Sequence, residues 1–351
     1  MSNMIDYVKT YQESMQQMPF TEVDSLVLAQ LAYLSYPHIT TAVRISDMAT
    51  MIQVPTNDNA SRELLAAVIA SRRFQNLQVL DYLEEMDVDL EKQFAVVTFL
   101  LETEQLYIAF RGTDGTLTGW KEDFNMAFQY PIPSQTAALA YVCQTASLYG
   151  KPFYLGGHSK GGNLAVYAAC LLPADLQKYL LYVFSHDGPG FHQDFLDACY
   201  FGTIKTKLKK TVPECSLIGM LLFTQERYTI VKSNRFYIME HDPFSWEIEE
   251  NHFIVVDQLS DGSIYTNLVL HQWLAGLSYE QREKFVDIIF MILKKTGVTT
   301  FQELLAIWPT NIIIMLKTIN ELDDEEKFYV WETLKSLILI AIKRLPSILL
   351  N

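Results

Sequence analysis

Cysteine is scarce in this sequence, which has only four cysteines among 351 residues. None of them lies in the C-x-x-C spacing that is typical of zinc sites and redox motifs. The pattern predicts small buried thiols in a reducing compartment, and neither a metal nor a cofactor is expected. The four residues are Cys143, Cys170, Cys199 and Cys215.

Long hydrophobic runs are also missing. The nearest candidate, residues 334–350, is interrupted by three basic residues and a proline, whereas a membrane-spanning helix needs roughly 18 apolar residues. Residues 1–19 have neither the basic segment nor the apolar segment of a signal peptide. We therefore expect a cytoplasmic protein with no integral membrane span.

Basic residues are outnumbered, since 27 Lys and Arg face 41 Asp and Glu and the formal net charge is -14. A field of this sign repels nucleic acid and anionic lipid headgroups, so we expect no nucleic-acid partner. Half of the residues are hydrophobic and 13% are aromatic, which indicates a packed globular core. The oligomeric state stays open.

Strand-like and helix-like segments alternate between about residues 94 and 260. Two apolar runs, 94–101 and 106–110, are separated by a polar break and predict a β-hairpin. The alternation indicates an α/β fold with a mostly parallel central sheet flanked by helices. Further strands are expected at 152–155, 180–184, 228–231, 235–239, 253–256 and 263–266.

Helical patterns frame this α/β region. Thr21 is expected to cap a helix that stops before Pro37, and residues 61–73 predict a second helix. From Ser278 onward the pattern is helical throughout. We therefore expect residues 1–277 to form the α/β domain with its N-terminal helices, and residues 278–351 to form a helical C-terminal region.

One pentapeptide, Gly157 to Gly161, reads Gly-His-Ser-Lys-Gly and matches G-x-S-x-G. An apolar strand precedes it and a helix-like run follows, which is the strand–turn–helix context of a nucleophile elbow. The flanking glycines suit a strained turn, and the helix N-terminus favours negative charge near the serine oxygen. The segment predicts Ser159 as the nucleophile of an α/β-hydrolase-type enzyme. The alternative is a glycine-rich turn in an ordinary βα unit.

With this motif in place, the chain resembles the class 3 lipases, and more closely a bacterial family of lipase-like proteins of unknown function. The likeness covers roughly residues 20–255 and leaves the C-terminal helices unexplained. It is carried by Phe-Thr-Glu-Val-Asp at 20–24, Ala-Phe-Arg-Gly-Thr-Asp at 109–114, the elbow at 157–162, Asp-Gly-Pro-Gly-Phe at 187–191, and the segment 225–246 with His-Asp-Pro at 241–243.

The resemblance implies the oxyanion-hole donors. In class 3 lipases the residue after the Arg-Gly pair supplies one donor, and that position is Thr113 here. The backbone N–H of Lys160, directly after the nucleophile, would be the second. The alternative is an ordinary loop with a surface arginine.

The serine also needs a base, and histidine is the usual one. The chain order serine, acid, histidine excludes His38 and favours a late histidine. His241 follows an expected strand and precedes Pro243, and the resemblance places the histidine there as well. His271, in a helix-like run, and His252 stay open as alternatives.

The acid that orients the base is less directly indicated. At the position where the resemblance to class 3 lipases places the acid, this chain has Ser216, so the sequence departs from the lipase pattern. Asp187 is the first choice, because it directly follows the strand after the nucleophile helix. Asp242 and Glu214 are alternatives, and an aspartate that only caps its own turn is a further interpretation of Asp187.

These residues predict hydrolysis of a carboxylic ester through a Ser-His-Asp triad, with a small-molecule ester or acyl compound as substrate. Two other functions stay open: a non-catalytic protein that keeps the hydrolase fold, and an acyltransferase or thioesterase on the same triad. The C-terminal helices have two interpretations. They either pack on each other and on the sheet, or they form a cap that walls an acyl-binding cleft.

Overall fold

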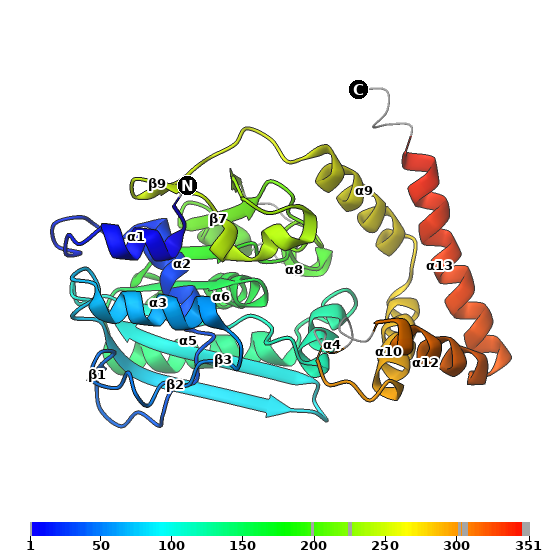
Figure 1. The fold of residues 1–351 in the computed structure, drawn as a ribbon, viewed down its shortest axis with the longest axis horizontal. Coiled ribbons are helices and arrows are strands. Elements are labelled where there is room, and N and C mark those ends of the chain that lie inside the picture. Colours follow the sequence, from blue (N-terminus) through cyan, green and yellow to red (C-terminus); the bar gives the residue numbers. More distant parts are fainter. Residues whose placement is uncertain (1, 198–199, 224–226, 301–302, 304–307, 346–351) are drawn as a thin grey trace. The chain divides into compact units, whose positions relative to one another are not determined.

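The computed structural model describes residues 2–197, 200–223, 227–300, 303 and 308–345 (Figure 1). The chain divides into two compact units, each assembled from several segments. Unit 1 comprises residues 1–86, 94–112 and 133–263, and unit 2 comprises residues 87–93, 113–132 and 264–351. Cys199, Gln225 and the chain end after Leu345 lie outside the described residues.

An eight-stranded sheet forms the centre of unit 1, with its strands in the order β1 to β8. The pairs β1–β2 and β3–β4 are antiparallel, and β4 through β8 are parallel. The mostly parallel α/β sheet and the hairpin expected from the sequence are therefore confirmed. The strands are β1 (Val43–Arg44), β2 (Gln78–Asp87), β3 (Lys92–Leu100), β4 (Leu106–Phe110), β5 (Phe153–His158), β6 (Leu180–His186), β7 (Leu208–Pro213) and β8 (Tyr228–Val231).

Helices cover both faces of this sheet. Successive residues of a strand point to opposite faces of the sheet. On β5, a side chain at Gly156 would collide with Tyr107 on one face, and a side chain at Gly157 would collide with Gly161 on the other. Tyr107 shares a hydrophobic core with α2, and Gly161 belongs to α6, so α2 and α6 lie on opposite faces. Helices of unit 1 are α1 (Met4–Thr10), α2 (Glu22–Leu31), α3 (Asn59–Ala70), α5 (Pro133–Tyr149), α6 (Lys160–Leu171), α7 (Ala174–Gln177) and α8 (Gln193–Asp197).

The Phe-Thr-Glu-Val-Asp motif has a structural role at the start of α2. Thr21 caps the helix, as expected, in a reciprocal capping box with Asp24. The Asp24 carboxylate also receives Arg73 Nε at 2.7 Å, and both side chains are fully buried. Arg73 further donates to the backbone carbonyls of Glu13, Met18 and Pro19. This network fastens the N-terminal segment to α2.

Two expected strands are wrong. Residues 235–239 do not join the sheet, because Val255 bridges β8 at Val231, and the segment instead leads into the 3-10 helix η2 (Tyr237–His241). Residues 263–266 lie in α9 (Asp261–Ala275), whose first turn is capped by the Ser260 hydroxyl accepting from Ser263 N–H. In both places the local β-branched and aromatic pattern was overridden by tertiary or capping contacts. The remaining short elements are β9 (Ile248–Glu249), β10 (His252–Phe253), η1 (Tyr200–Thr203) and η3 (Pro243–Ser245).

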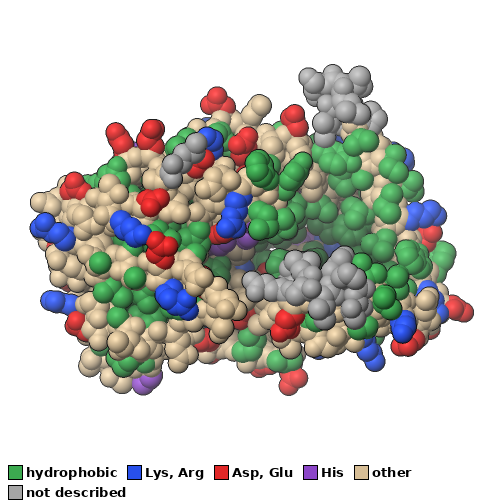
Figure 2. Space-filling view, in the orientation of Figure 1, with side chains coloured by type: hydrophobic (Ala, Val, Ile, Leu, Met, Phe, Trp, Pro, Cys, Tyr) green, Lys and Arg blue, Asp and Glu red, His purple; other side chains and the backbone are tan. Residues whose placement is uncertain are grey.

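Unit 2 is largely helical. Besides residues 264–275 of α9, its described helices are α4 (Leu117–Asn125), α10 (Tyr279–Lys295), α12 (Trp308–Glu321) and α13 (Asp324–Arg344). Ser278 and Asp323 cap α10 and α13, which agrees with the helical pattern after residue 277. The unit also takes in α4 from the middle of the chain. Apolar side chains are exposed along the last two helices, and green side chains gather over this part of the surface in Figure 2.

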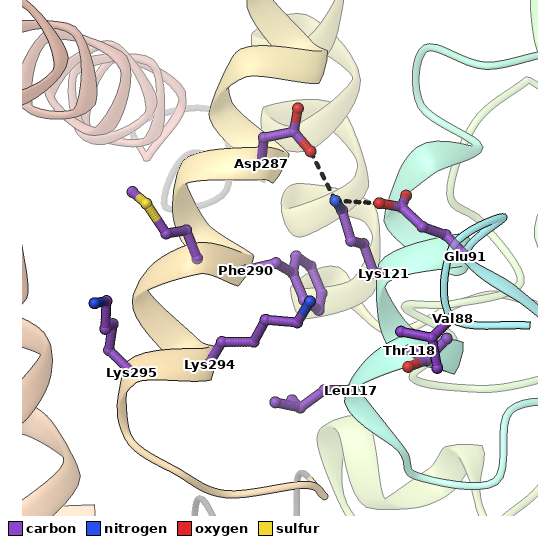
Figure 3. A pocket seen from close by; sticks show the side chains of 10 residues that line it. Val88, Glu91, Leu117, Thr118, Lys121, Asp287, Phe290, Lys294 and Lys295 are labelled. Carbon is purple, nitrogen blue, oxygen red and sulfur yellow. Dashed lines mark hydrogen bonds and ion pairs between the residues drawn. The ribbon is translucent and has the colours of Figure 1, made fainter.

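A cavity of about 390 Å³ lies within unit 2. Figure 3 shows Lys121 of α4 reaching between two carboxylates, with ion pairs of 2.5 Å to Glu91 and 2.8 Å to Asp287 of α10. Leu117 and Phe290 line the cavity and belong to the hydrophobic core that joins α4 to α10. None of the helices in the described ranges is long and apolar enough to cross a membrane.

Candidate active site

The predicted nucleophile lies at the sharp turn between β5 and α6. Ser159 has φ 57° and ψ −132°, a backbone conformation that is uncommon for any residue other than glycine. The Ser159 N–H donates to the carbonyl of His186 on β6 at 2.9 Å, which holds the turn against the neighbouring strand. Strained backbone of this kind costs on the order of 1–3 kcal/mol and clusters at functional sites. The strand–turn–helix context of a nucleophile elbow is therefore present.

Close backbone approach explains two glycines near Ser159. A side chain at Gly161 would collide with the Phe110 carbonyl at the end of β4. A Cβ at Gly112 would lie 2.7 Å from the His158 carbonyl oxygen and 3.2 Å from the Ser159 Cβ. The loop after β4 therefore passes directly beside the elbow, and neither position has room for a side chain.

The two residues expected to supply oxyanion donors occupy different units. Lys160 is the first residue of α6, so its N–H lies at a helix N-terminus beside Ser159. Thr113 belongs to unit 2, where its hydroxyl donates to the Asp123 carboxylate on α4. The oxyanion roles of both residues stay predictions.

The predicted base and acid are in direct contact. His241 Nδ1 lies 2.6 Å from Asp187 Oδ2, although the two residues are 54 positions apart in the chain. Asp187 is fully buried, whereas a quarter of the His241 side chain is exposed. A carboxylate at Nδ1 selects the imidazole tautomer that leaves Nε2 unprotonated, which is the form that a general base requires.

The other Asp187 oxygen is held by the loop after β7. Oδ1 accepts from the Ser216 hydroxyl at 2.6 Å and from the Gly219 N–H at 3.1 Å. Ser216 occupies the position at which the lipase pattern led us to expect an acid. It binds the carboxylate that comes from the adjacent strand end, β6. Sequence reasoning identified Ser216 only as a departure and missed both donors.

The alternative acid and base residues are placed differently. Asp242 forms an ion pair with Arg235 at 2.7 Å and caps the N–H of Phe244. His252 lies on β10 with an exposed side chain, and His271 lies on α9 in unit 2. For Glu214, the contacts seen are backbone hydrogen bonds to Val231 and Ser260.

Another histidine, His186, is buried at the end of β6. Its Nε2 lies 2.9 Å from the Ser25 hydroxyl, and Ser25 contacts the Tyr107 hydroxyl at 2.8 Å. Burial lowers the pKa of His186 to about 3, so the ring is neutral at physiological pH. His186 is thus a structural histidine that ties β6 to α2 and β4.

In the part of the chain that the structure describes, no hydrogen bond joins the Ser159 hydroxyl to the His241 ring. In free enzymes such bonds are often long and tighten only in the substrate complex. The described residues likewise contain no group of three or more His, Cys, Asp or Glu side chains that could hold a metal ion.

The sheet order, the elbow and the contact of the buried Asp187 with His241 define the chain as a protein with the α/β-hydrolase fold. The family model described as Mbeg1-like matches residues 68–291, which is more than half of the chain. The protein therefore belongs to the Mbeg1-like family, a lipase-like family.

Several solved lipase structures are similar to this chain at low sequence identity. The Rhizomucor miehei lipase–propeptide complex has 17% identity over 48% of this chain and 58% of that chain, with a TM-score of 0.35. M37 lipase has 14% identity over 58% of this chain and 70% of that chain, with a TM-score of 0.39. A fungal lipase–inhibitor complex has 16% identity over 60% of this chain and 78% of that chain, also with a TM-score of 0.39. The chain thus spans less than two thirds of the Rhizomucor lipase chain. No curated protein sequence matches it.

Proposed function

We propose that this protein is a serine hydrolase that cleaves carboxylic esters, with Ser159 as nucleophile, His241 as base and Asp187 as the residue that orients the base. The observation that carries the proposal is the contact of the buried Asp187 carboxylate with the partly exposed His241 ring, formed beside a strained serine elbow. The His241 ring centroid lies 4.5 Å from that of His158, the residue that immediately precedes Ser159. The proposed base therefore lies close to the elbow that carries the proposed nucleophile, within unit 1.

The proposed reaction has two halves. His241 Nε2 takes the hydroxyl proton as the Ser159 oxygen bonds to the ester carbonyl carbon, and the same proton then passes to the departing alcohol as the C–O bond breaks. In the second half, His241 takes a proton from a water molecule as the water oxygen bonds to the acyl carbon. His241 then returns this proton to the Ser159 oxygen as the bond from that oxygen to the acyl carbon breaks and the acid leaves. The N–H groups of Lys160 and Thr113 are the proposed donors to the oxyanion.

A small-molecule ester or acyl compound is the proposed substrate, and the cytoplasm is the proposed location. The division into an α/β domain of residues 1–277 and a helical C-terminal region of residues 278–351 likewise belongs to the proposal. A non-catalytic protein with the hydrolase fold is the second candidate, and the missing hydrogen bond between Ser159 and His241 favours it.

A fluorophosphonate probe separates the two candidates, because it reacts with an activated serine but not with an inert one. The full-length protein is incubated with the probe, and the labelled peptide is identified by mass spectrometry. Stoichiometric labelling at Ser159 that is lost in Ser159→Ala and reduced in Asp187→Asn is the expected result. A folded wild-type protein that takes up no probe would establish the non-catalytic alternative.

A further inference from the structure

The histidine inside the elbow is buried, and both of its ring nitrogens are engaged. His158 Nε2 lies 2.8 Å from the backbone carbonyl oxygen of His241, and Nδ1 lies 3.2 Å from the Tyr33 hydroxyl. A carbonyl oxygen can only accept, so Nε2 carries the proton and Nδ1 accepts from Tyr33. The two contacts therefore select one neutral tautomer of His158.

We infer that His158 is a positioning residue for His241, which rests on the proposed function of His241 as the base. The His158 N–H holds the backbone of His241, while the two rings lie against each other with centroids 4.5 Å apart and planes inclined by 34°. Asp187 sets the rotation of the His241 ring through Nδ1. His158 sets the position of the backbone from which that ring projects.

The surroundings of His241 explain why such an anchor is needed. Residues 236–239, which lead into His241, have exposed side chains, and Tyr237 has φ 52°. The inner end of the segment is held by side chains, because the buried Trp246 ring N–H donates to the Glu240 carbonyl at 2.8 Å. His158 does the same for the next carbonyl, that of His241. Two successive carbonyls are thus tied to the interior at the point where the loop turns inward.

His158 also links the base to the nucleophile. It is the last residue of β5, and Ser159 follows it directly. The parallel neighbour of His158 on β6 is His186, which immediately precedes Asp187. The proposed nucleophile and acid therefore follow neighbouring strand ends, and His158 binds the backbone of the proposed base from one of them. A shift of about 1 Å between reacting groups can cost on the order of 100-fold in rate.

The neutral state of His158 suits this arrangement. Burial, and then the neighbouring His241, lower the pKa of His158 well below its ordinary value. The titratable groups that face it are His241 from η2, His186 from β6 and Tyr33 from the turn after α2. A neutral ring at this position does not oppose the positive charge that His241 gains during the reaction.

The experiment compares three variants of the full-length protein. His158→Gln places an amide N–H at the position of Nε2, His158→Asn places it at the position of Nδ1, and His158→Leu removes both the donor at Nε2 and the acceptor at Nδ1. For each variant, kcat and KM on a p-nitrophenyl ester, the rate of fluorophosphonate labelling at Ser159 and the thermal unfolding midpoint are measured. The downfield proton resonance of His241 Nδ1–H reports the Asp187–His241 bond independently of turnover.

We expect the Asn and Leu variants to lose on the order of 100-fold in kcat and in labelling rate at unchanged KM, with a shifted or broadened Nδ1–H resonance. The Gln variant should recover most of this loss. If the His158→Leu variant does not fold, the comparison of His158→Gln with His158→Asn tests the inference. Equal rates in Gln and Asn, or losses that follow the unfolding midpoint alone, overturn the inference. Wild-type protein without labelling would contradict the proposed hydrolase itself, which is a distinct outcome.

Discussion

The Ser216 hydroxyl donates to Asp187 Oδ1 at 2.6 Å, and the opposite oxygen of the same carboxylate contacts His241. The position at which the lipase pattern led us to expect an acid thus holds a serine that binds the proposed acid, Asp187, at the end of the neighbouring strand. The Ser216 backbone is itself held, because its carbonyl accepts from the Ser263 hydroxyl at 2.6 Å. The hydroxyl that binds Asp187 is therefore itself fixed through the Ser216 backbone.

Removing this hydroxyl tests how far catalysis depends on it. We expect Ser216→Ala to lower kcat on p-nitrophenyl esters about tenfold, because a hydrogen bond to a charged group contributes roughly 1.5–3 kcal/mol and the Gly219 N–H still holds the carboxylate. Ser46→Ala is the matched control, since Ser46 also donates to an aspartate, Asp47, but at the surface. Unchanged kcat in Ser216→Ala would show that Asp187 needs no such support.

The proposed base is tested by its removal. His241→Ala should reduce kcat by on the order of 10⁴-fold or more, because the members of a triad act as one unit and the nucleophile is inactive without its base. His252→Ala, which alters an exposed histidine on β10, should keep full activity in the same assay. Were His271→Ala the damaging change instead, the assignment of the base would be wrong.

The buried Asp24–Arg73 pair predicts a change in stability. Asp24→Asn leaves the Arg73 charge buried without its counterion, which should lower the free energy of unfolding by about 3–5 kcal/mol. Urea unfolding followed by circular dichroism measures this directly. Glu63→Gln removes the exposed partner of Lys9 and should cost less than about 1 kcal/mol. Similar losses in the two variants would contradict the importance of burial.

His186 predicts a dependence of stability on pH. Its pKa is about 3 in the folded protein against an ordinary value of 6.5, so below pH 6.5 the unfolded chain binds a proton that the folded protein does not. This group's contribution is therefore fully present above pH 6.5 and decreases as the pH falls toward 3, by about 1.4 kcal/mol per pH unit. His186→Gln should lose stability less steeply between pH 7 and pH 5 in urea titrations. Parallel curves for the two proteins would rule out this role.

Several features could be predicted from the sequence because they depend on neighbouring residues. The Thr21 cap, the β3–β4 hairpin and the elbow geometry at Ser159 follow from capping, alternation and glycine placement within a few positions. The apolar run at 235–239 met the same local criteria for a strand, but it does not form one. Its place beside β8 is taken by Val255, which no local pattern reveals.

The sequence by itself determined that a serine stands on a strained turn between a strand and a helix, because that turn needs only its own glycines and its own periodicity. The tertiary structure alone decided which carboxylate meets which histidine: Asp187 follows β6 and His241 ends η2, 54 residues away in the chain. It also decided that Ser216 and Gly219 hold the Asp187 carboxylate and that His158 binds the backbone of His241. Such contacts depend on the order and twist of the parallel strands, which bring loops that are distant in the chain together at one edge of the sheet. The spacing of residues along the chain does not show which loops meet there.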